Sequence, residues 1–368
     1  MVEFRSARPE EMEEVVELVN YVFRTSGGME PTMGRQFPTI FCPDNASDIY
    51  VAADEGRIIA NIAIKRNTGI IYGHKVSMAN MGAVCTHPQY RGRGIGTQLL
   101  NMVFDRLNEE EVSVVTISGT RGLYRRNQCV EAGGMVTYVL DKQSYSYWAL
   151  GGMEYEISKQ FDDTGVLCDV YQREAVRYQR SRMEFPVLLK AVPMVHPPVD
   201  ALTTLVAFRE GRKDSALAYL IGYENKPGVF KVVEYAGERL AVWWLAGKLL
   251  EHAGMNGVIL EVPIYDAVLS SILSSEGIRG INSYYPSTTV RITNKSSLWR
   301  EIYPIVEEMW HGGDKPPCGI EDLPGNVYHD LEELTTFLFA GFNRHPYGAP
   351  WDRIFPIPLP WPNGLNYV

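Results

Sequence analysis

The sequence predicts an α/β (α+β) protein with two mixed-sheet units in tandem and a small C-terminal α/β segment. Its 368 residues exceed the usual size of one domain, and the first 140 of them alternate strand and helix patterns. The order three strands, helix, strand, helix then recurs between residues 204 and 275. We interpret this as a weak internal repeat, in the order of elements and not in residue identity. Apolar residues make up 45% and charged residues 21%, values of a globular protein that exclude fibrous and disordered classes.

The first unit opens with a short strand, Val2–Arg5, and an amphipathic helix. Pro9 suits the first position of that helix, and apolar side chains from Met12 to Phe23 recur at helical spacing. Residues 25–46 are rich in Gly and Pro, so we predict a loop region with short helical pieces there.

Strands and one more helix complete the predicted first unit. Alternating and β-branched patterns give strand candidates at Ile49–Ala53, Arg57–Ile64, Gly69–Met78, Asn80–Thr86 and Val112–Ser118. A glycine-rich turn leads into an amphipathic helix, Gly94–Leu107, ahead of the last of these strands. We expect the strand Met135–Leu140 to close the unit, so that the first domain spans residues 1–145.

The second unit is predicted to start near Tyr155 and to lie within residues 150–285. Its first element is a polar, basic helix candidate, Asp169–Phe185. The following strand and helix candidates are Thr204–Phe208, Ala216–Gly222, Val229–Tyr235, Leu240–Ala253, Gly257–Val262 and Ala267–Ser275. Residues 286–368 form the third predicted part, with a strand at Thr288–Thr293, a helix at Leu331–Phe339 and a proline-rich extended arm at the end.

Charge and composition exclude several functional classes. A net charge of −9 and a pI near 5.4 disfavour nucleic-acid binding, which normally needs an excess of Lys and Arg. The five cysteines contain no Cys-x-x-Cys and the histidines show no ligand spacing, so we predict no metal site. The acidic N-terminus differs from a signal peptide, and no run approaches the roughly 20 apolar residues of a membrane span. We therefore expect a soluble, cytoplasmic protein.

The segment that carries chemistry is a strand followed by Arg91-Gly-Arg-Gly-Ile-Gly-Thr97 and directly by a helix. Glycines let backbone N–H groups approach a pyrophosphate, and the positive end of the helix dipole lies at the same place. The glycine spacing excludes the dinucleotide fingerprint, and a P-loop would need Gly-Lys-Ser/Thr. What remains is Arg-x-x-Gly-x-Gly, in the order Arg91, Gly94, Gly96.

This segment resembles the GNAT superfamily of N-acetyltransferases, and the resemblance covers about residues 1–142. It implies acetyl-CoA as the acyl donor, with backbone groups of Val84, Cys85 and Thr86 on the pantetheine arm. It also implies that Gly119 and Thr120 line the end of the next strand. The residues implied to surround the pyrophosphate are Arg91, Gly92, Arg93, Gly94, Ile95, Gly96 and Thr97.

The resemblance also implies a general acid. In the family a tyrosine on the following helix often donates a proton to the departing CoA thiolate. Tyr124 stands at that position, within Arg-Gly-Leu-Tyr-Arg-Arg.

The tandem organisation resembles the Eis-like (enhanced intracellular survival) acetyltransferases. In the second unit the corresponding turn, Tyr235-Ala-Gly-Glu-Arg-Leu-Ala241, has one glycine and an acid, so we expect it to bind no CoA. The family's third part is a sterol-carrier-type fold. The stretch between Thr288 and His329 looks too short for the whole sheet of that fold, so we expect a reduced version in residues 286–368. The resemblance further implies a homo-oligomer, and a role for the terminal carboxylate of Val368 in the active site.

The predicted function is therefore an N-acetyltransferase, in which a primary amine attacks acetyl-CoA directly. The acceptor stays open between aminoglycoside-like polyamines, a peptide lysine and a small metabolite amine. An alternative from another class is a catalytically weak, acyl-CoA-binding regulatory protein. The anion cradle, as we call the turn Arg91–Thr97, would bind CoA in the enzyme and in the regulatory protein alike.

Overall fold

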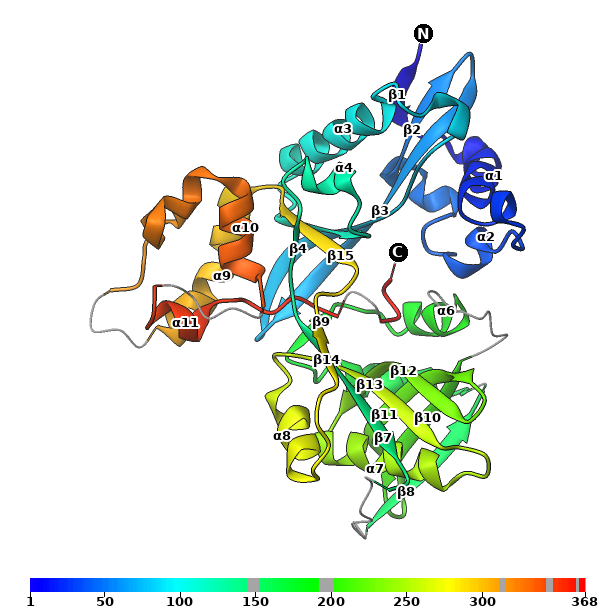
Figure 1. Cartoon of the computed structure of the whole chain (residues 1–368), viewed down its shortest axis with the longest axis vertical. Coiled ribbons are helices and arrows are strands. Elements are labelled where there is room, and N and C mark those ends of the chain that lie inside the picture. Colours follow the sequence, from blue (N-terminus) through cyan, green and yellow to red (C-terminus); the bar gives the residue numbers. More distant parts are fainter. Residues whose placement is uncertain are drawn as a thin grey trace. The chain divides into compact units, whose positions relative to one another are not determined.

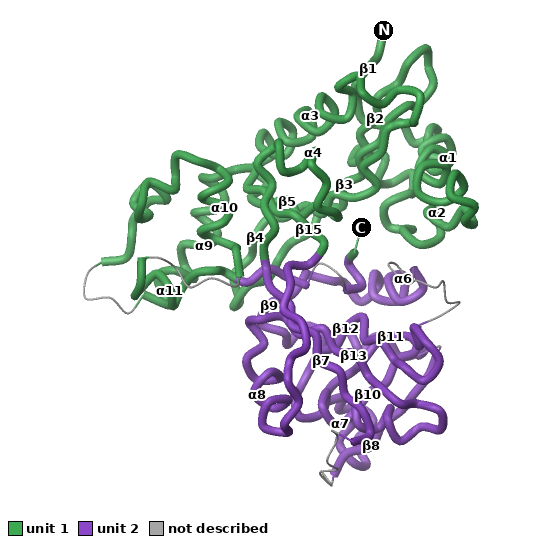
Figure 2. The backbone as a smooth tube through the Cα atoms, in the orientation of Figure 1, with its two compact units in different colours: residues 1–132, 287–357, 367–368 green, residues 133–286, 358–366 purple. Residues whose placement is uncertain are grey.

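The computed structural model describes residues 1–143, 152–159, 161–191, 202–310, 315–341, 347–361 and 364–367. The chain forms two compact units (Figure 2). Unit 1 comprises residues 1–132 and 287–357 together with Tyr367, and unit 2 comprises residues 133–286 and 358–366. The two compact units are groups of residues that contact one another, which does not test the functional domains predicted from the sequence. The predicted domains, residues 1–145, 150–285 and 286–368, therefore remain proposals.

Unit 1 contains a mixed sheet in the strand order β1-β2-β3-β4-β5-β15-β6 (Figure 1). The strands are β1 Glu3–Ser6, β2 Ile49–Asp54, β3 Arg57–Ile71, β4 His74–Thr86, β5 Val114–Ser118, β6 Val130–Glu131 and β15 Thr288–Ile292. Strands β4 and β5 pair in parallel, and the other neighbours along this order pair antiparallel. This mixed α/β architecture confirms the predicted fold class.

Helices cover both faces of this sheet. The first face carries α1 (Met12–Phe23) and α2 (Met33–Gln36), and the second carries α3 (Ile95–Glu109). Alternation along β2 explains the two cores: Ile49 packs with α1, whereas Tyr50 packs with α3. The remaining helices of unit 1 are α4 Gly122–Arg125, α9 Lys295–Met309, α10 Leu331–Phe339 and α11 Trp351–Ile354.

The long hairpin β3–β4 differs from its prediction. The sequence analysis placed strands at Arg57–Ile64, Gly69–Met78 and Asn80–Thr86, but the chain turns at Tyr72-Gly73. Both turn residues have positive φ, 50° and 92°, as a two-residue hairpin turn requires. The prediction missed this turn because Tyr rarely occupies the first of these positions.

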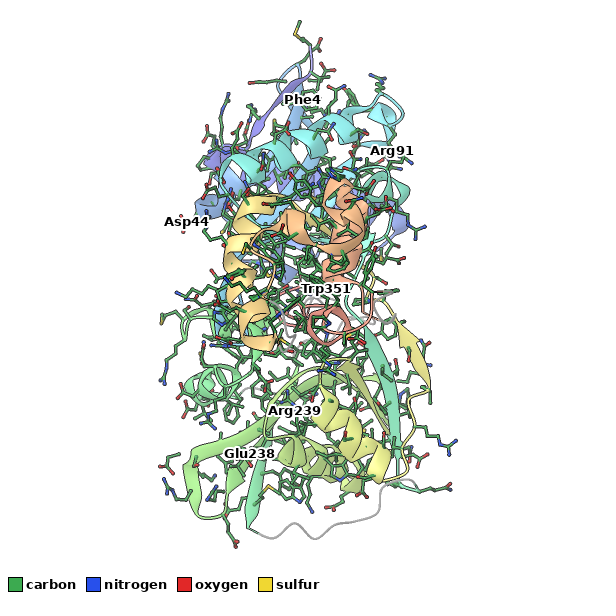
Figure 3. All side chains as sticks on the ribbon, turned by 90° about the vertical axis from the view of Figure 1, so that its left-hand side faces the viewer. Phe4, Asp44, Arg91, Glu238, Arg239 and Trp351 are labelled. Carbon is green, nitrogen blue, oxygen red and sulfur yellow. The ribbon has the colours of Figure 1, made fainter. Side chains whose placement is uncertain are left out.

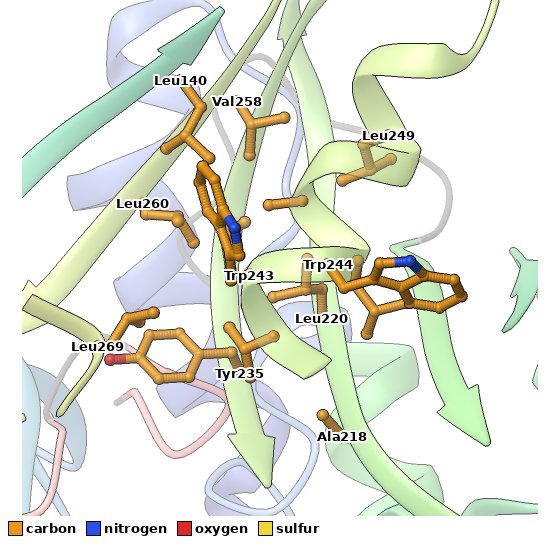
Figure 4. Packing of buried hydrophobic residues seen from close by; sticks show 14 of the residues in the cluster. Leu140, Ala218, Leu220, Tyr235, Trp243, Trp244, Leu249, Val258, Leu260 and Leu269 are labelled. Carbon is orange, nitrogen blue, oxygen red and sulfur yellow. The ribbon is translucent and has the colours of Figure 1, made fainter. Parts of the chain in front are cut away.

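Unit 2 contains a seven-stranded sheet in the order β14-β7-β13-β12-β11-β10-β8. The strands are β7 Met135–Asp141, β8 Met153–Ser158, β10 Thr203–Arg209, β11 Arg212–Lys226, β12 Val229–Gly237, β13 Gly257–Pro263 and β14 Asn282–Tyr284. The helices α7 (Arg239–Glu251) and α8 (Ala267–Ser275) pack on one face. Trp243 and Trp244 of α7 are buried in that core (Figure 4), so neither offers a binding platform.

The predicted helix Asp169–Phe185 is wrong. The structure has α5 Thr164–Tyr171, β9 Val176–Tyr178 and α6 Glu184–Ala191 there. The Tyr171 hydroxyl accepts the Tyr178 backbone N–H at 3.0 Å, a contact that closes a turn between α5 and β9. Tertiary contacts thus override the local helical pattern.

Two strands pair elsewhere than expected. The predicted closing strand of the first unit, β7, pairs with β13 and β14 in the sheet of unit 2. The strand assigned to the third part, β15, lies between β5 and β6 in the sheet of unit 1. The sequence analysis also missed α9, whose apolar face is buried.

Candidate active site

The candidate site is a fork between the parallel strands β4 and β5. Their pairing runs from Met78 opposite Val114 to Met81 opposite Ile117. Beyond this point β4 continues to Thr86 without a partner on that side among the described residues. The backbone groups of Val84, Cys85 and Thr86 therefore include donors and acceptors that a ligand can use.

A β-bulge in β4 lies at the opening of the fork. On β3 one residue, Ile62, stands opposite both Ala83 and Val84, and Ala83 has φ of +49°. The buried Asn61 donates from Nδ2 to the Ala83 carbonyl at 3.0 Å and so fixes the bulge. The bulge turns backbone groups of β4 away from the ladder, which sequence patterns do not reveal.

Arg121 spans the fork. Its Nη1 donates to the Val84 carbonyl at 3.2 Å, and its guanidinium lies 5.6 Å from the Phe23 ring centre. The Val84 carbonyl, which the resemblance assigned to the pantetheine arm, thus accepts one hydrogen bond from an arginine. A carbonyl oxygen has two lone pairs, so this bond does not exclude a second one from a ligand.

The glycine-rich turn follows β4 and ends in α3, as predicted. Gly92 and Gly94 both have φ of 76°, and Gly94 is the N-cap of α3. Helix geometry leaves the N–H groups of Ile95 and Gly96 without an intrahelical acceptor. A Cβ at Gly96 would meet Thr86 Oγ1 at 3.5 Å, an ordinary contact, so packing alone does not require glycine there. The turn therefore presents free N–H groups at the positive end of a helix.

Charges and polar side chains surround this turn. Arg91 Nε donates to the Thr86 carbonyl at 3.1 Å, and Arg93 lies over the Tyr90 ring at 5.0 Å. Both arginines are exposed (Arg91 is labelled in Figure 3), and none of the ion pairs among the described residues uses either. Thr97 is exposed beside them. The turn thus carries uncompensated positive charge, as an anion cradle needs.

The other side of the fork is the end of β5. Gly119 has φ of 112°, donates its N–H to the Ser287 carbonyl at 2.8 Å and accepts from Thr289 Oγ1 at 3.3 Å. Thr120 follows, half-buried, before α4 begins. The strand β15, which the sequence analysis assigned to the third part, therefore fixes this wall of the fork together with Ser287.

Tyr124 on α4 is buried, with 1% of its surface exposed. Burial raises its pKa to about 12, against the opposing charge of Arg121. No hydrogen bond to its hydroxyl is found among the residues that the structure describes. The phenol is thus protonated at neutral pH and can donate to a ligand.

Cys85 lies near Tyr124 but has different chemistry. Its thiol is buried, and burial raises its pKa to about 12, although the backbone hydrogen bond from Asn61 acts to lower it. The thiol is therefore protonated and a poor nucleophile at neutral pH.

The site contains residues that the sequence analysis missed. Tyr367, close to the chain end, packs against Phe37 at 6.2 Å between ring centres and hydrogen-bonds to Ser118. Burial raises the Tyr367 pKa, while the Ser118 hydrogen bond and the charges of Arg24 and Arg121 oppose this. The one sequence feature that pointed to this packing is the proline-rich extended arm at the end of the chain. Val368, predicted to contribute its carboxylate, lies outside the described residues.

Unit 2 has a different arrangement at the corresponding turn. The Glu174 carboxylate accepts the Gly237 N–H at 2.7 Å and binds Arg239, which also pairs with Asp266 at 2.8 Å (Arg239 is labelled in Figure 3). The protein's own carboxylate thus occupies the N-terminus of α7, where a phosphate would bind in a cradle. The expectation that unit 2 binds no CoA stays a prediction, and this carboxylate gives it a physical reason.

A family model described as an acetyltransferase (GNAT) domain matches residues 3–129. This part of the chain is a GNAT acetyltransferase domain. The fork, the cradle and Tyr124 all lie within the match, so the site belongs to the GNAT domain. No curated protein matches the chain significantly.

Solved structures extend the similarity beyond the GNAT domain. A probable N-acyltransferase from Enterococcus faecalis V583 is 18% identical, with a TM-score of 0.66 over 82% of this chain and 74% of that chain. A GCN5-related N-acetyltransferase from Anabaena variabilis is 16% identical, with a TM-score of 0.63 over 83% and 75%. Eis1 from Mycobacterium abscessus is 15% identical, with a TM-score of 0.59 over 79% and 74%. At these identities the similarity concerns the fold alone. Among the described residues no helix is long and apolar enough to cross a membrane.

A glycine substitution tests the cradle. Gly92→Val places a β-branched side chain at φ of 76°, beside the free N–H groups of the turn. We expect the Kd for acetyl-CoA, measured by calorimetry, to rise about ten-fold or more, because at least one charge-assisted hydrogen bond is lost. Gly73→Val is the matched control: both glycines have positive φ and open space around them. Both variants should lose about 1–2 kcal/mol of stability, and an equal loss of affinity in both would contradict the assignment.

Proposed function

We propose that this protein is an N-acetyltransferase that moves an acetyl group from acetyl-CoA to a primary amine. The observation that carries the proposal is the meeting of three features in one GNAT domain: the β4–β5 fork, the anion cradle at α3, and the buried, protonated Tyr124. The fork suits an extended pantetheine arm, and the cradle suits a pyrophosphate. Amine-dependent release of CoA thiol from acetyl-CoA tests the proposal.

In the proposed mechanism the neutral amine attacks the thioester carbonyl directly. A backbone N–H of β4 at the bulge stabilises the oxyanion, and the new C–N bond forms as the C–S bond breaks. Tyr124 gives its proton to the leaving thiolate and recovers one from water. The excess proton on nitrogen leaves to solvent.

The direct mechanism predicts that no cysteine carries the acetyl group. Cys85→Ala should keep kcat within about three-fold of the wild type, because a thiol with a pKa of about 12 forms almost no thiolate at neutral pH. Steady-state rates and mass spectrometry of the intact protein after incubation with acetyl-CoA check this. An acetylated Cys85 that turns over would replace direct attack by a two-step route.

Finer assignments extend this proposal. The tandem arrangement and the fold similarity to Eis1 support membership of an Eis-like subfamily, as a homo-oligomer with a reduced sterol-carrier-like C-terminal part. The docking of Tyr367 beside Ser118 supports a role for the Val368 carboxylate in the reaction. The residues on acetyl-CoA are proposed to be those predicted from the sequence, Val84–Thr86, Arg91–Thr97, Gly119 and Thr120.

A further inference from the structure

Unit 2 has a fork of its own, between the parallel strands β12 and β13. The two strands pair only over residues 229–231 of β12 and residues 257–259 of β13. Beyond these pairs β12 continues along β11 and β13 continues along β7, so the two strands separate. The fork therefore exposes backbone groups of both strands to whatever lies there, as the β4–β5 fork does in unit 1.

The C-terminal arm of unit 2, residues 358–361 and 364–366, lies against the separated part of β12. On one face of the sheet the Trp361 ring packs against Tyr235, at 5.5 Å between ring centres, beside the core under α7. On the other face Leu365 is buried in the core under α5 and α6, and its N–H donates to Glu234 Oε2 at 3.1 Å. The arm thus changes from one face to the other beside this fork.

A set of close contacts, which we call the anchor, holds the arm there. Glu234 accepts two hydrogen bonds of 2.7 Å from Arg180 and one of 2.8 Å from the Tyr219 hydroxyl. Arg180 Nε also donates to Asn366 Oδ1 at 2.6 Å. A Cβ at Gly364 would lie 2.7 Å from Glu234 Oε2, closer than real Cβ atoms come. Because its partners hold this carboxylate in place, a side chain at position 364 should displace the arm.

The residue after the anchored segment belongs to the candidate site. Tyr367 packs against Phe37, at 6.2 Å between ring centres, in a cluster that includes Ala83 of the β4 bulge and Cys85. Consecutive Cα atoms are only about 3.8 Å apart, so the position of Asn366 limits where Tyr367 can lie.

We infer that unit 2 holds the C-terminal arm for the reaction in unit 1, with Arg180, Glu234 and Gly364 as positioning residues for Tyr367. This rests on the proposed function and gives unit 2 a part in it. Under that proposal the fork of unit 1 holds acetyl-CoA, whereas the fork of unit 2 holds the protein's own chain. Tyr367 then forms a wall of the site beside the bulge, where the oxyanion is stabilised. Moving such a group by about 1 Å can lower a rate about 10²-fold, because the reacting groups lose their alignment.

The test disturbs the anchor in the full chain without altering a residue of unit 1. Gly364→Val should lower kcat/KM for the amine about ten-fold to a hundred-fold and leave the Kd for acetyl-CoA little changed. Asn366→Ala, which removes an acceptor of Arg180, is a milder second variant that should act in the same direction. Tyr367→Ala should cause a loss similar to that of Gly364→Val. If the anchor acts through Tyr367, the double variant should lose no more than either single one, whereas independent effects would multiply.

Gly257→Ala is the matched control, in the same unit and also at a glycine without a positive φ. The atom nearest to a Cβ there is the Leu140 carbonyl oxygen at 3.6 Å, an ordinary contact, so this variant should keep kcat/KM. Hydrogen exchange of the Leu365 amide reports on the anchor itself. It should be slow in the wild type and in Tyr367→Ala, and fast in Gly364→Val.

Three results would overturn the inference. The first is an unchanged kcat/KM in Gly364→Val although its Leu365 amide exchanges fast. The second is a double variant whose losses multiply, and the third is an equal loss in Gly257→Ala. If the wild type acetylates no amine, the proposed function fails, and hydrogen exchange then judges the anchor separately. Slow exchange that is lost in Gly364→Val would support the anchor, and equally fast exchange in both proteins would refute it.

Discussion

Tyr124→Phe should lower kcat by about 10²–10⁴-fold while leaving acetyl-CoA affinity near that of the wild type. The substitution removes one oxygen from a side chain that is 1% exposed and whose hydroxyl has no hydrogen-bond partner in the described structure. The substitution should therefore cost little folding stability. Its effect should fall on kcat, through the step in which the CoA thiolate is protonated. Steady-state kinetics and calorimetry with acetyl-CoA separate the two effects.

The matched control is Tyr50→Phe, which alters a second buried tyrosine of the same core, on β2 away from the fork. It should retain kcat. The pH profile gives an independent check. Because the pKa of Tyr124 is raised to about 12, the donor stays protonated, and kcat/KM should rise as the amine loses its proton, with no fall below about pH 10. Equal kcat in Tyr124→Phe and the wild type would remove Tyr124 from the mechanism.

Glu234→Gln should destabilise unit 2 by about 3–5 kcal/mol, because it leaves a buried guanidinium without its counter-charge. Arg180 and Glu234 pair through two hydrogen bonds of 2.7 Å, with side chains 1% and 5% exposed. Tyr219 and the Leu365 N–H also donate to this carboxylate, and Arg180 Nε donates to Asn366 Oδ1 at 2.6 Å. The pair therefore holds the segment 364–366 within unit 2.

Denaturant unfolding of the full chain, followed by circular dichroism and tryptophan fluorescence, measures this effect. The matched control is Asp169→Asn, which breaks an arginine pair of similar geometry with Arg182 on the surface, at 50% and 66% exposure. That variant should lose no more than about 1 kcal/mol. A loss of similar size in both variants would mean that burial gives the Arg180–Glu234 pair no special role.

Local patterns predicted much of the fold. The helices α8 and α10 match their predicted ranges, and the cradle, its arginines and the following helix lie together because they are contiguous in sequence. Contacts between distant segments were not predictable in this way. The strand β7 pairs in the sheet of unit 2 and β15 in the sheet of unit 1, contrary to the prediction for each. This pairing depends on which sheet edges are available, and the residues of the two strands do not encode it.

The candidate site shows the same limit. The β4 bulge follows from Asn61, which lies on another strand, and the packing of Tyr367 against Phe37 joins two distant parts of the chain. A single sequence carries no signal for such convergence. Tyr124 could be singled out from the sequence because its spacing from the cradle follows the family pattern, and its role as general acid stays a prediction.

Thiol release from acetyl-CoA, measured across amino acids, polyamines, aminoglycosides and lysine peptides, tests directly whether the protein is an acetyltransferase. We expect amine-dependent release, an acetylated amine found by mass spectrometry, and loss of the signal in Tyr124→Phe. Confirmed acetyl-CoA binding with no amine-dependent release from any member of the panel would contradict an acetyltransferase and favour the regulatory, acyl-CoA-binding alternative.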